Sequence, residues 1–305
     1  MRRYGGAGDR GTSVTGNRAA FDDFYWWSAD GLRLHARDYG GDANRPAILC
    51  MPGLTRNARD FADLAEQLSP EWRMLAVEFR GRGESAYAKD PMSYVPLTYA
   101  QDMAALVEAA GITRFVAVGT SLGGIVAMLL AGMMPERIAG AVLNDIGPEI
   151  EAAGLARVRG YVGKSSNHPT WMHAARALQE SSGAVYPDWG IEDWLAMAKR
   201  VYRLSSAGRI VLDYDARIAE PFRLPGNEAG PDMWRAYAAL SEVPVLVVRG
   251  ERSDMLSAAT AERMIAAPPK ATLVTVPRVG HVPTLAEPQA LAAVRQLLGE
   301  VAEPG

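Results

Sequence analysis

Short, continuous apolar runs alternate with helical stretches through much of the chain. The apolar runs lack the polar alternation of a half-exposed strand, as in AILCM at 47–51 and RFVAVG at 114–119. Runs of this kind are typical of strands that are buried on both faces of a parallel sheet. The stretches between them, such as YAQDMAALVEAAG at 99–111, have helical character. Strand–helix alternation predicts an α/β fold built on a doubly wound, mostly parallel sheet.

The pattern differs at the beginning of the chain. The first 20 residues are rich in Gly and Arg, and no apolar segment follows the initial MRR, so a flexible tail is predicted rather than a signal sequence. Residues 23–39 contain two β-rich runs on either side of Asp30-Gly31. This dipeptide is a favoured two-residue turn, and the segment is therefore predicted to form a β-hairpin.

The strand–helix rhythm is also interrupted in the second half of the chain. It stops after Gly147-Pro148 and resumes with VPVLVVRG at 243–250. Residues 148 to about 230 contain helical stretches and three of the seven tryptophans, and this segment ends in LPGNEAGPD. We therefore predict a helical insertion between two strands of one sheet. The predicted parts are a tail at 1–20, a core at 21–147 and 231–305, and an inserted helical cap at 148–230.

Composition narrows the possible functions. The 305 residues are 49% hydrophobic and 22% charged, with a formal net charge of −3, which is typical of a globular protein and argues against a nucleic-acid partner. A single cysteine, Cys50, cannot form an internal disulfide, and the four histidines form no H-E-x-x-H pair, so no metal is expected. The longest near-apolar run, GGIVAMLLAGMMP, is too short to span a bilayer. A cytoplasmic protein without a membrane partner is expected; nothing in the sequence sets its oligomeric state.

One serine has the setting of a nucleophile. The stretch VAVGTSLGGIVAML, at 116–129, places Ser121 between Gly119 and Gly123, with an apolar strand before it and a helix after it. In a nucleophile elbow the serine backbone is strained and neighbouring chain comes close, which favours small flanking residues. The N-terminus of the following helix offers partial positive charge to an oxyanion. Chance could also place a serine among glycines, but the strand–turn–helix context favours the nucleophile.

A serine hydroxyl needs a base to become a good nucleophile. His281, in PRVGHVPTLAEP, is the favoured base because it follows the predicted strand at 271–277 and so lies at the carboxyl edge of the sheet. The other histidines lie in the hairpin (His35) or in the insertion (His168 and His173).

The imidazole needs an acceptor that orients it and stabilises its charged form. Two aspartates follow predicted core strands: Asp254 comes after 243–250, and Asp145 ends 138–145. We expect Asp254 to accept the hydrogen bond from His281 Nδ1. Asp145 is the competing acceptor, although its place next to the start of the insertion favours a role at the hinge of the cap.

The order Ser121, Asp254, His281 resembles that of the α/β-hydrolase superfamily. GTSLGG resembles the nucleophile elbow of this family, and FRGRGES at 79–85 looks like its loop after the fourth strand. RGERSD and VGHVP resemble its acid and histidine loops. The resemblance runs from about residue 22 to residue 300, with the insertion in the place of the family's helical cap.

The chain departs from the family at the oxyanion loop. Where the family usually has His-Gly-X after its third strand, this chain has Met51-Pro52-Gly53-Leu54. By position, the resemblance implies that the backbone N–H groups of Leu54 and Leu122 form the oxyanion hole.

The resemblance implies a capped serine hydrolase that cleaves carboxylic esters or lactones through an acyl-enzyme on Ser121, without a cofactor. Relatives that open haloalkanes or epoxides use an aspartate nucleophile, and the serine argues against both reactions. Carbon–carbon bond hydrolases and cofactor-free perhydrolases use a serine and stay open as alternatives. A ligand receptor of the same fold with slow turnover is a further alternative from a different class.

Aromatic residues of the insertion indicate a small-molecule substrate that is apolar or aromatic. The alternative interpretation is that these residues only pack against the core. The aromatic residues concerned are Tyr161, Trp171, Trp189 and Trp194.

Overall fold

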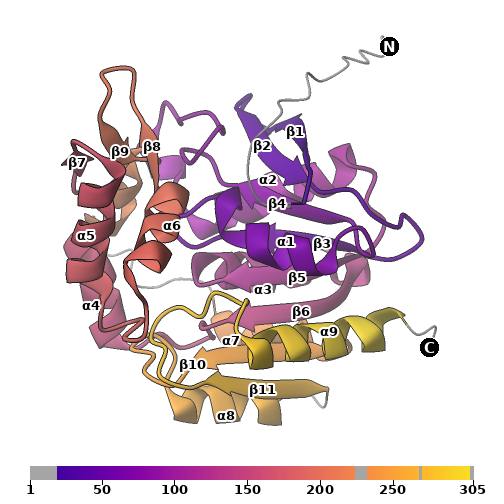
Figure 1. Ribbon diagram of the computed structural model, residues 1–305. Coiled ribbons are helices and arrows are strands. Elements are labelled where there is room, and N and C mark those ends of the chain that lie inside the picture. Colours follow the sequence, from indigo (N-terminus) through magenta and orange to yellow (C-terminus); the bar gives the residue numbers. More distant parts are fainter. Residues whose placement is uncertain (1–18, 224–231, 268–269, 303–305) are drawn as a thin grey trace.

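The computed structural model describes residues 19–223, 232–267 and 270–302. The tail predicted at 1–20 therefore lies almost wholly outside the described residues. Within them, an eight-stranded sheet has the order β1-β2-β4-β3-β5-β6-β10-β11 and a three-stranded sheet has the order β7-β9-β8 (Figure 1). The large sheet consists of β1 (Asp22–Trp27), β2 (Arg33–Asp38), β3 (Ala47–Met51), β4 (Met74–Glu78), β5 (Phe115–Thr120), β6 (Ile138–Asn144), β10 (Val245–Gly250) and β11 (Ala271–Val276). The small sheet consists of β7 (Asn167–His168), β8 (Tyr202–Leu204) and β9 (Ile210–Leu212).

The large sheet is mostly parallel, as the apolar runs predict. β1 and β2 form the expected antiparallel hairpin, and β2 is also antiparallel to β4. The other neighbouring strands pair in parallel. Strands β3 to β6 are buried along their whole length. The predicted α/β class with a mostly parallel sheet and an N-terminal hairpin is confirmed.

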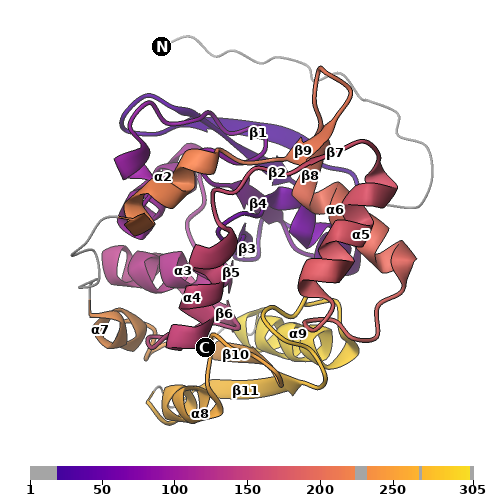
Figure 2. The same cartoon turned by 90° about the vertical axis from the view of Figure 1, so that its left-hand side faces the viewer.

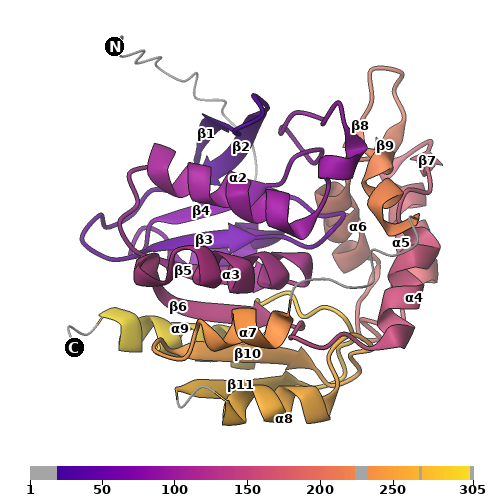
Figure 3. The ribbon, with the colours of Figure 1, turned by 180° about the vertical axis from the view of Figure 1, so that it is seen from behind.

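Helices cover both faces of this sheet. Successive side chains of β3 point to opposite faces of the sheet. Leu49 packs in the apolar cluster on one face, and Ile48 and Cys50 pack in the cluster on the other. Helices α1 and α9 lie on one face (Figure 1), and α2, α3, α7 and α8 lie on the other (Figure 3). The core helices are α1 (Ala62–Leu68), α2 (Pro96–Ala109), α3 (Leu122–Met133), α7 (Met233–Ala238), α8 (Ala258–Ala266) and α9 (Pro288–Ala302). Short 3-10 helices are η1 (Ala58–Phe61), η2 (Pro91–Ser93), η3 (Pro135–Arg137) and η4 (Ala216–Arg223).

The segment between β6 and β10 forms a separate layer at one end of the large sheet (Figures 1 and 2). It contains helices α4 (Ala152–Tyr161), α5 (Trp171–Ser182) and α6 (Ile191–Val201), as the helical pattern predicts, together with the small β7–β9 sheet. The small sheet was not predicted, since strands of two or three residues are too short to give a periodic signal. Its interior is an apolar cluster around Trp194, Ala175 and Ala198. We call residues 148–223 the cap.

Candidate active site

Ser121 lies in the sharp turn that joins β5 to α3. Its backbone has φ 52° and ψ −115°, a strained conformation for a residue with a side chain. A Cβ atom at Gly123 would collide with the carbonyl oxygen of Met51, and one at Gly119 would collide with the backbone of Gly123. The two glycines therefore permit the close approach of β3, β5 and α3 that the turn requires.

His281 reaches Ser121 from the loop after β11. Its Nε2 is 2.9 Å from Ser121 Oγ, and its Nδ1 is 2.8 Å from an oxygen of Asp145. With the proton on Nδ1 donated to Asp145, Nε2 accepts the hydrogen bond of the serine hydroxyl. The Asp145 side chain is fully buried and the His281 side chain is 9% exposed, so little water competes for these contacts.

The expectation that Asp254 accepts the His281 hydrogen bond is wrong: Asp145 makes this contact. The reason is strand order. β6 lies directly between β5 and β10, so Asp145, which follows β6, is next to the serine turn. The Asp145 carboxylate is further fixed by the Gly250 N–H at 2.8 Å and the Ser253 hydroxyl at 2.7 Å.

Asp254 instead connects the core to the cap. Its two oxygens accept from Nε and Nη2 of Arg157, in α4, at 2.5 and 2.8 Å. The hydrogen bond from Arg157 lowers the pKa of Asp254 below its ordinary value. The two predicted roles are therefore exchanged, because Asp254 holds the cap and Asp145 holds the histidine.

Leu54 and Leu122 both line the pocket that contains Ser121. Leu122 is the first residue of α3, where backbone N–H groups have no acceptor within the helix. The loop before Leu54 is also close to the serine, since a Cβ at Gly53 would lie 3.8 Å from Ser121 Cβ.

Arg82, for which no role was predicted from the sequence, holds this loop. Arg82, in FRGRGES, is fully buried. Its Nε donates to the Leu54 carbonyl at 2.8 Å, and its Nη1 donates to the Arg80 carbonyl and to the Tyr99 hydroxyl. The only signal in the sequence was the resemblance of the motif itself.

A cavity of about 560 Å³ extends from the serine between core and cap. Of the four cap aromatics singled out from the sequence, Tyr161 and Trp194 line it, whereas Trp171 and Trp189 pack within the cap. Tyr186 also lines the cavity and had not been singled out. Burial raises the pKa of both Tyr161 and Tyr186, so their phenol groups are neutral near pH 7.

Tyr186 connects the cap to the histidine loop. Its hydroxyl donates to the Val282 carbonyl at 2.6 Å, and its ring stacks on Trp189 with 3.8 Å between ring centroids. The neighbouring Val185 carbonyl accepts from the Gly280 N–H at 2.9 Å. The residues before and after His281 are therefore both held by the cap.

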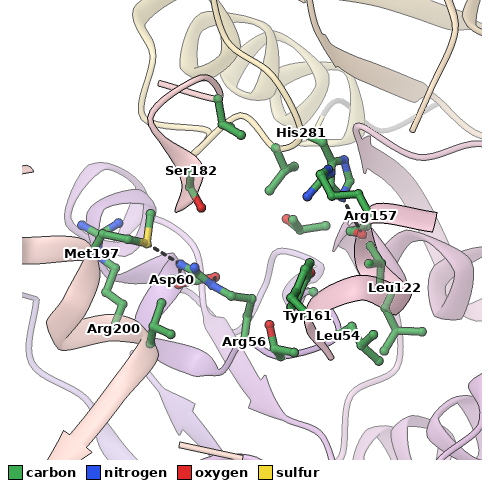
Figure 4. Close-up of a pocket in the computed structure, with 18 of the residues that line it drawn as sticks. Leu54, Arg56, Asp60, Leu122, Arg157, Tyr161, Ser182, Met197, Arg200 and His281 are labelled. Carbon is green, nitrogen blue, oxygen red and sulfur yellow. Dashed lines mark hydrogen bonds and ion pairs between the residues drawn. The ribbon is translucent and has the colours of Figure 1, made fainter. Parts of the chain in front are cut away.

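Charged side chains also line the cavity. Arg56 donates to both oxygens of Asp60 at 2.7 and 2.6 Å, and its Nη2 is 2.8 Å from the sulfur of Met197 (Figure 4). Arg200, Arg157 and Lys164 complete the set of cations. In the described ranges, no cluster of three or more His, Cys, Asp or Glu side chains could hold a metal ion. No helix in these same ranges is long and apolar enough to cross a membrane.

The hydrogen-bonded Ser–His–Asp arrangement at the carboxyl edge of a mostly parallel sheet, beside an inserted helical segment, is typical of the α/β hydrolases. The model of the Alpha/beta hydrolase family matches residues 48–294. The chain therefore belongs to this family, and its class of activity is that of a hydrolase.

Individual relatives agree with this assignment. The chain is 33% identical over 271 residues to a 3-hydroxybutyrate-oligomer hydrolase of Cupriavidus necator, covering 87% of this chain and 92% of the relative. It is 28% identical to a 2-(acetamidomethylene)succinate hydrolase of Mesorhizobium japonicum, covering 82% and 85%. A crystal structure of an alpha/beta hydrolase from Novosphingobium aromaticivorans is similar with a TM-score of 0.88 and 60% identity, covering 92% of this chain and 99% of that one.

Proposed function

We propose that the protein is a serine hydrolase that cleaves carboxylic esters or lactones through an acyl-enzyme on Ser121. The observation that carries this proposal is the hydrogen-bonded series of Ser121 Oγ, His281 and Asp145, with distances of 2.9 and 2.8 Å. His281 Nε2 takes the hydroxyl proton as Ser121 Oγ attacks the acyl carbon. Asp145 keeps the proton of the imidazole on Nδ1 and stabilises the imidazolium that forms.

The second step returns the enzyme to its starting state. His281 gives its proton to the leaving alkoxide, and a water molecule, deprotonated by the same nitrogen, attacks the acyl carbon. The bond to Ser121 Oγ then breaks as His281 returns the proton to that oxygen, and the carboxylic acid is released. The negative oxygen of each tetrahedral intermediate accepts hydrogen bonds from the N–H groups of Leu54 and Leu122. Loss of one such donor typically costs about 3 kcal/mol of transition-state stabilisation. The reaction requires no cofactor, and we expect it to take place in the cytoplasm.

The substrate that we propose is a small aliphatic ester made from a hydroxy acid, such as a short linear 3-hydroxybutyrate oligomer. The similarity to the Cupriavidus necator hydrolase supports this choice. The cavity supports it too, because about 560 Å³ accommodates a chain of several ester units. Its lining is mostly apolar near the serine, with Leu54, Leu122 and Ile125.

The test uses purified wild-type protein and the Ser121→Ala variant. We expect multiple turnovers of p-nitrophenyl butyrate and of the 3-hydroxybutyrate trimer, with kcat reduced at least ~10³-fold in the variant. A melting curve checks that the variant is folded. Near wild-type turnover by Ser121→Ala refutes the mechanism, and turnover of p-nitrophenyl butyrate without turnover of the trimer refutes only the substrate.

A further inference from the structure

The charges that line the cavity are unbalanced. The lining contains four cationic side chains, Arg56, Arg157, Lys164 and Arg200. Its one carboxylate is that of Asp60. Arg157 and Arg200 are each paired with a carboxylate that does not line the cavity, so the lining itself presents more cations than anions. An apolar cavity with a few charged donors at fixed places is the usual form of a site that orients a ligand by its polar groups.

Some hydrogen-bond donors of Arg56 have no acceptor among the described residues. Its Nε and Nη2 engage both oxygens of Asp60, and the remaining contact of Nη2 is the thioether sulfur of Met197, a weak acceptor. A guanidinium has five N–H donors in a planar fork. Among the described residues, the recorded hydrogen bonds of Arg56 leave both donors of Nη1 without an acceptor, although the group lines the cavity.

This donor is separated from the catalytic residues. Figure 4 shows the Arg56 guanidinium on one side of the cavity with Asp60 and Met197, and His281 and Leu122 on the other. Arg200 lies on the same side as Arg56 in this view and lines the same cavity. Its Nη2 is paired with Asp63. A substrate that places its ester at Ser121 therefore presents its remote end to the Arg56 side.

We propose that the substrate of this hydrolase carries a carboxylate remote from the scissile ester, and that the Nη1 edge of Arg56 binds it. This proposal rests on the proposed function and adds to it a requirement for a remote carboxylate on the substrate and the residue that binds this carboxylate. Arginine suits the task because its fork matches a carboxylate in geometry and keeps its charge when partly buried.

A carboxylate fits this end better than a neutral polar group. Arg56 donates to both oxygens of Asp60, which offsets part of the negative charge that Asp60 presents to an incoming anion. Lys164, for which the described residues show no ion pair, adds positive potential at the cavity wall. A hydrogen bond to a charged acceptor is also roughly twice as strong as one between neutral groups.

The experiment compares two matched substrates on the full-length protein. One is the 3-hydroxybutyrate trimer as the free acid, and the other is the same trimer as its terminal carboxamide, which has nearly the same shape but is uncharged and carries an NH₂ donor. The ratio of their kcat/KM values is measured in wild type and in the double variant Arg56→Gln, Asp60→Asn. The double variant replaces an ion pair by a neutral hydrogen-bonding pair and so avoids leaving Asp60 unpaired.

Two control variants separate this site from other charges. Arg157→Gln with Asp254→Asn removes another ion pair at the cavity in the same way. Arg45→Gln removes an arginine that lies outside the cavity and pairs with Glu71. Turnover of p-nitrophenyl butyrate is measured in every sample, because it reports the esterase chemistry independently of any remote carboxylate.

We expect wild type to prefer the free acid by at least about tenfold, and the Arg56 double variant to lose most of that preference. Both control variants keep it. If wild type cleaves the carboxamide and the free acid with equal kcat/KM, the proposal is overturned even if the double variant does not fold. A preference lost only in the Arg157 control overturns the assignment to Arg56, and failure to turn over p-nitrophenyl butyrate refutes the proposed function instead.

Discussion

Replacing Asp145 by asparagine tests which aspartate holds the histidine. Three donors surround the Asp145 carboxylate: the Gly250 N–H on one oxygen, and the Ser253 hydroxyl and His281 Nδ1 on the other. An asparagine has one acceptor oxygen and one NH₂ donor. The Gly250 N–H cannot turn into an acceptor, so the amide oxygen faces Gly250 and the NH₂ group faces Ser253 and His281.

The magnitude follows from the tautomer that this orientation imposes. With an NH₂ donor opposite, Nδ1 of His281 becomes the acceptor and the ring proton moves to Nε2, which then cannot take the proton of Ser121. Loss of the correct tautomer in a triad lowers kcat by ~10⁴-fold, or about 5.5 kcal/mol. The fold is retained, because the Ser253 hydroxyl can accept from the new NH₂ group and asparagine tolerates the φ of 56° at this position.

The matched control is Asp254→Asn. It weakens the contact with Arg157, an ion pair whose side chains are 39% and 34% exposed, and such pairs contribute at most ~1 kcal/mol. We expect kcat within about fivefold of wild type. Steady-state kinetics on p-nitrophenyl butyrate at pH 7.5, with melting curves, compare the variants. An inactive, folded Asp254→Asn protein beside a nearly normal Asp145→Asn protein refutes the reasoning.

Other predictions concern stability and the placement of the histidine loop. Tyr186→Phe removes the hydroxyl that holds the residue after His281, and stopped-flow kinetics are expected to show kcat about tenfold lower with KM within about twofold. Burial opposes the charge of His35, but hydrogen bonds to two carboxylates raise its pKa above the ordinary value. Protonated His35 therefore contributes fully to folding stability below about pH 6.5, and this contribution is lost as the pH rises through the raised pKa. His35→Gln is therefore expected to lower Tm more at pH 6 than at pH 9, and an equal loss would contradict this. Arg80→Met leaves the buried Asp102 carboxylate without its partner and is expected to cost about 3–5 kcal/mol in urea unfolding; a loss below 1 kcal/mol speaks against it.

The sequence predicted the fold well because its signals were local. Fully apolar runs such as 47–51 mark strands buried on both faces, and the glycines around Ser121 are needed by one turn. The serine and His281 could be placed for the same reason, since Ser121 directly follows β5 and His281 lies in the loop after β11.

The acid could not be chosen from local signals. Both Asp145 and Asp254 follow core strands, and chain order favoured Asp254. Asp145 is the residue next to His281 because β6 is the immediate neighbour of β5 in the sheet. This depends on strand order in space rather than in sequence. Arg56 and Tyr186 were missed for a similar reason, because their partners Met197 and Val282 are far away in the chain.

In the proposed mechanism, His281, held by Asp145, makes Ser121 the nucleophile. The most direct test is to label wild-type protein with a fluorophosphonate, which reacts with activated serines, and to locate the adduct by intact mass and peptide mapping. We predict one adduct per chain, on Ser121, formed in parallel with the loss of esterase activity and at least ~10³-fold more slowly in His281→Ala. Loss of activity with the adduct on another residue, or unchanged labelling of Ser121 in His281→Ala, would contradict the account.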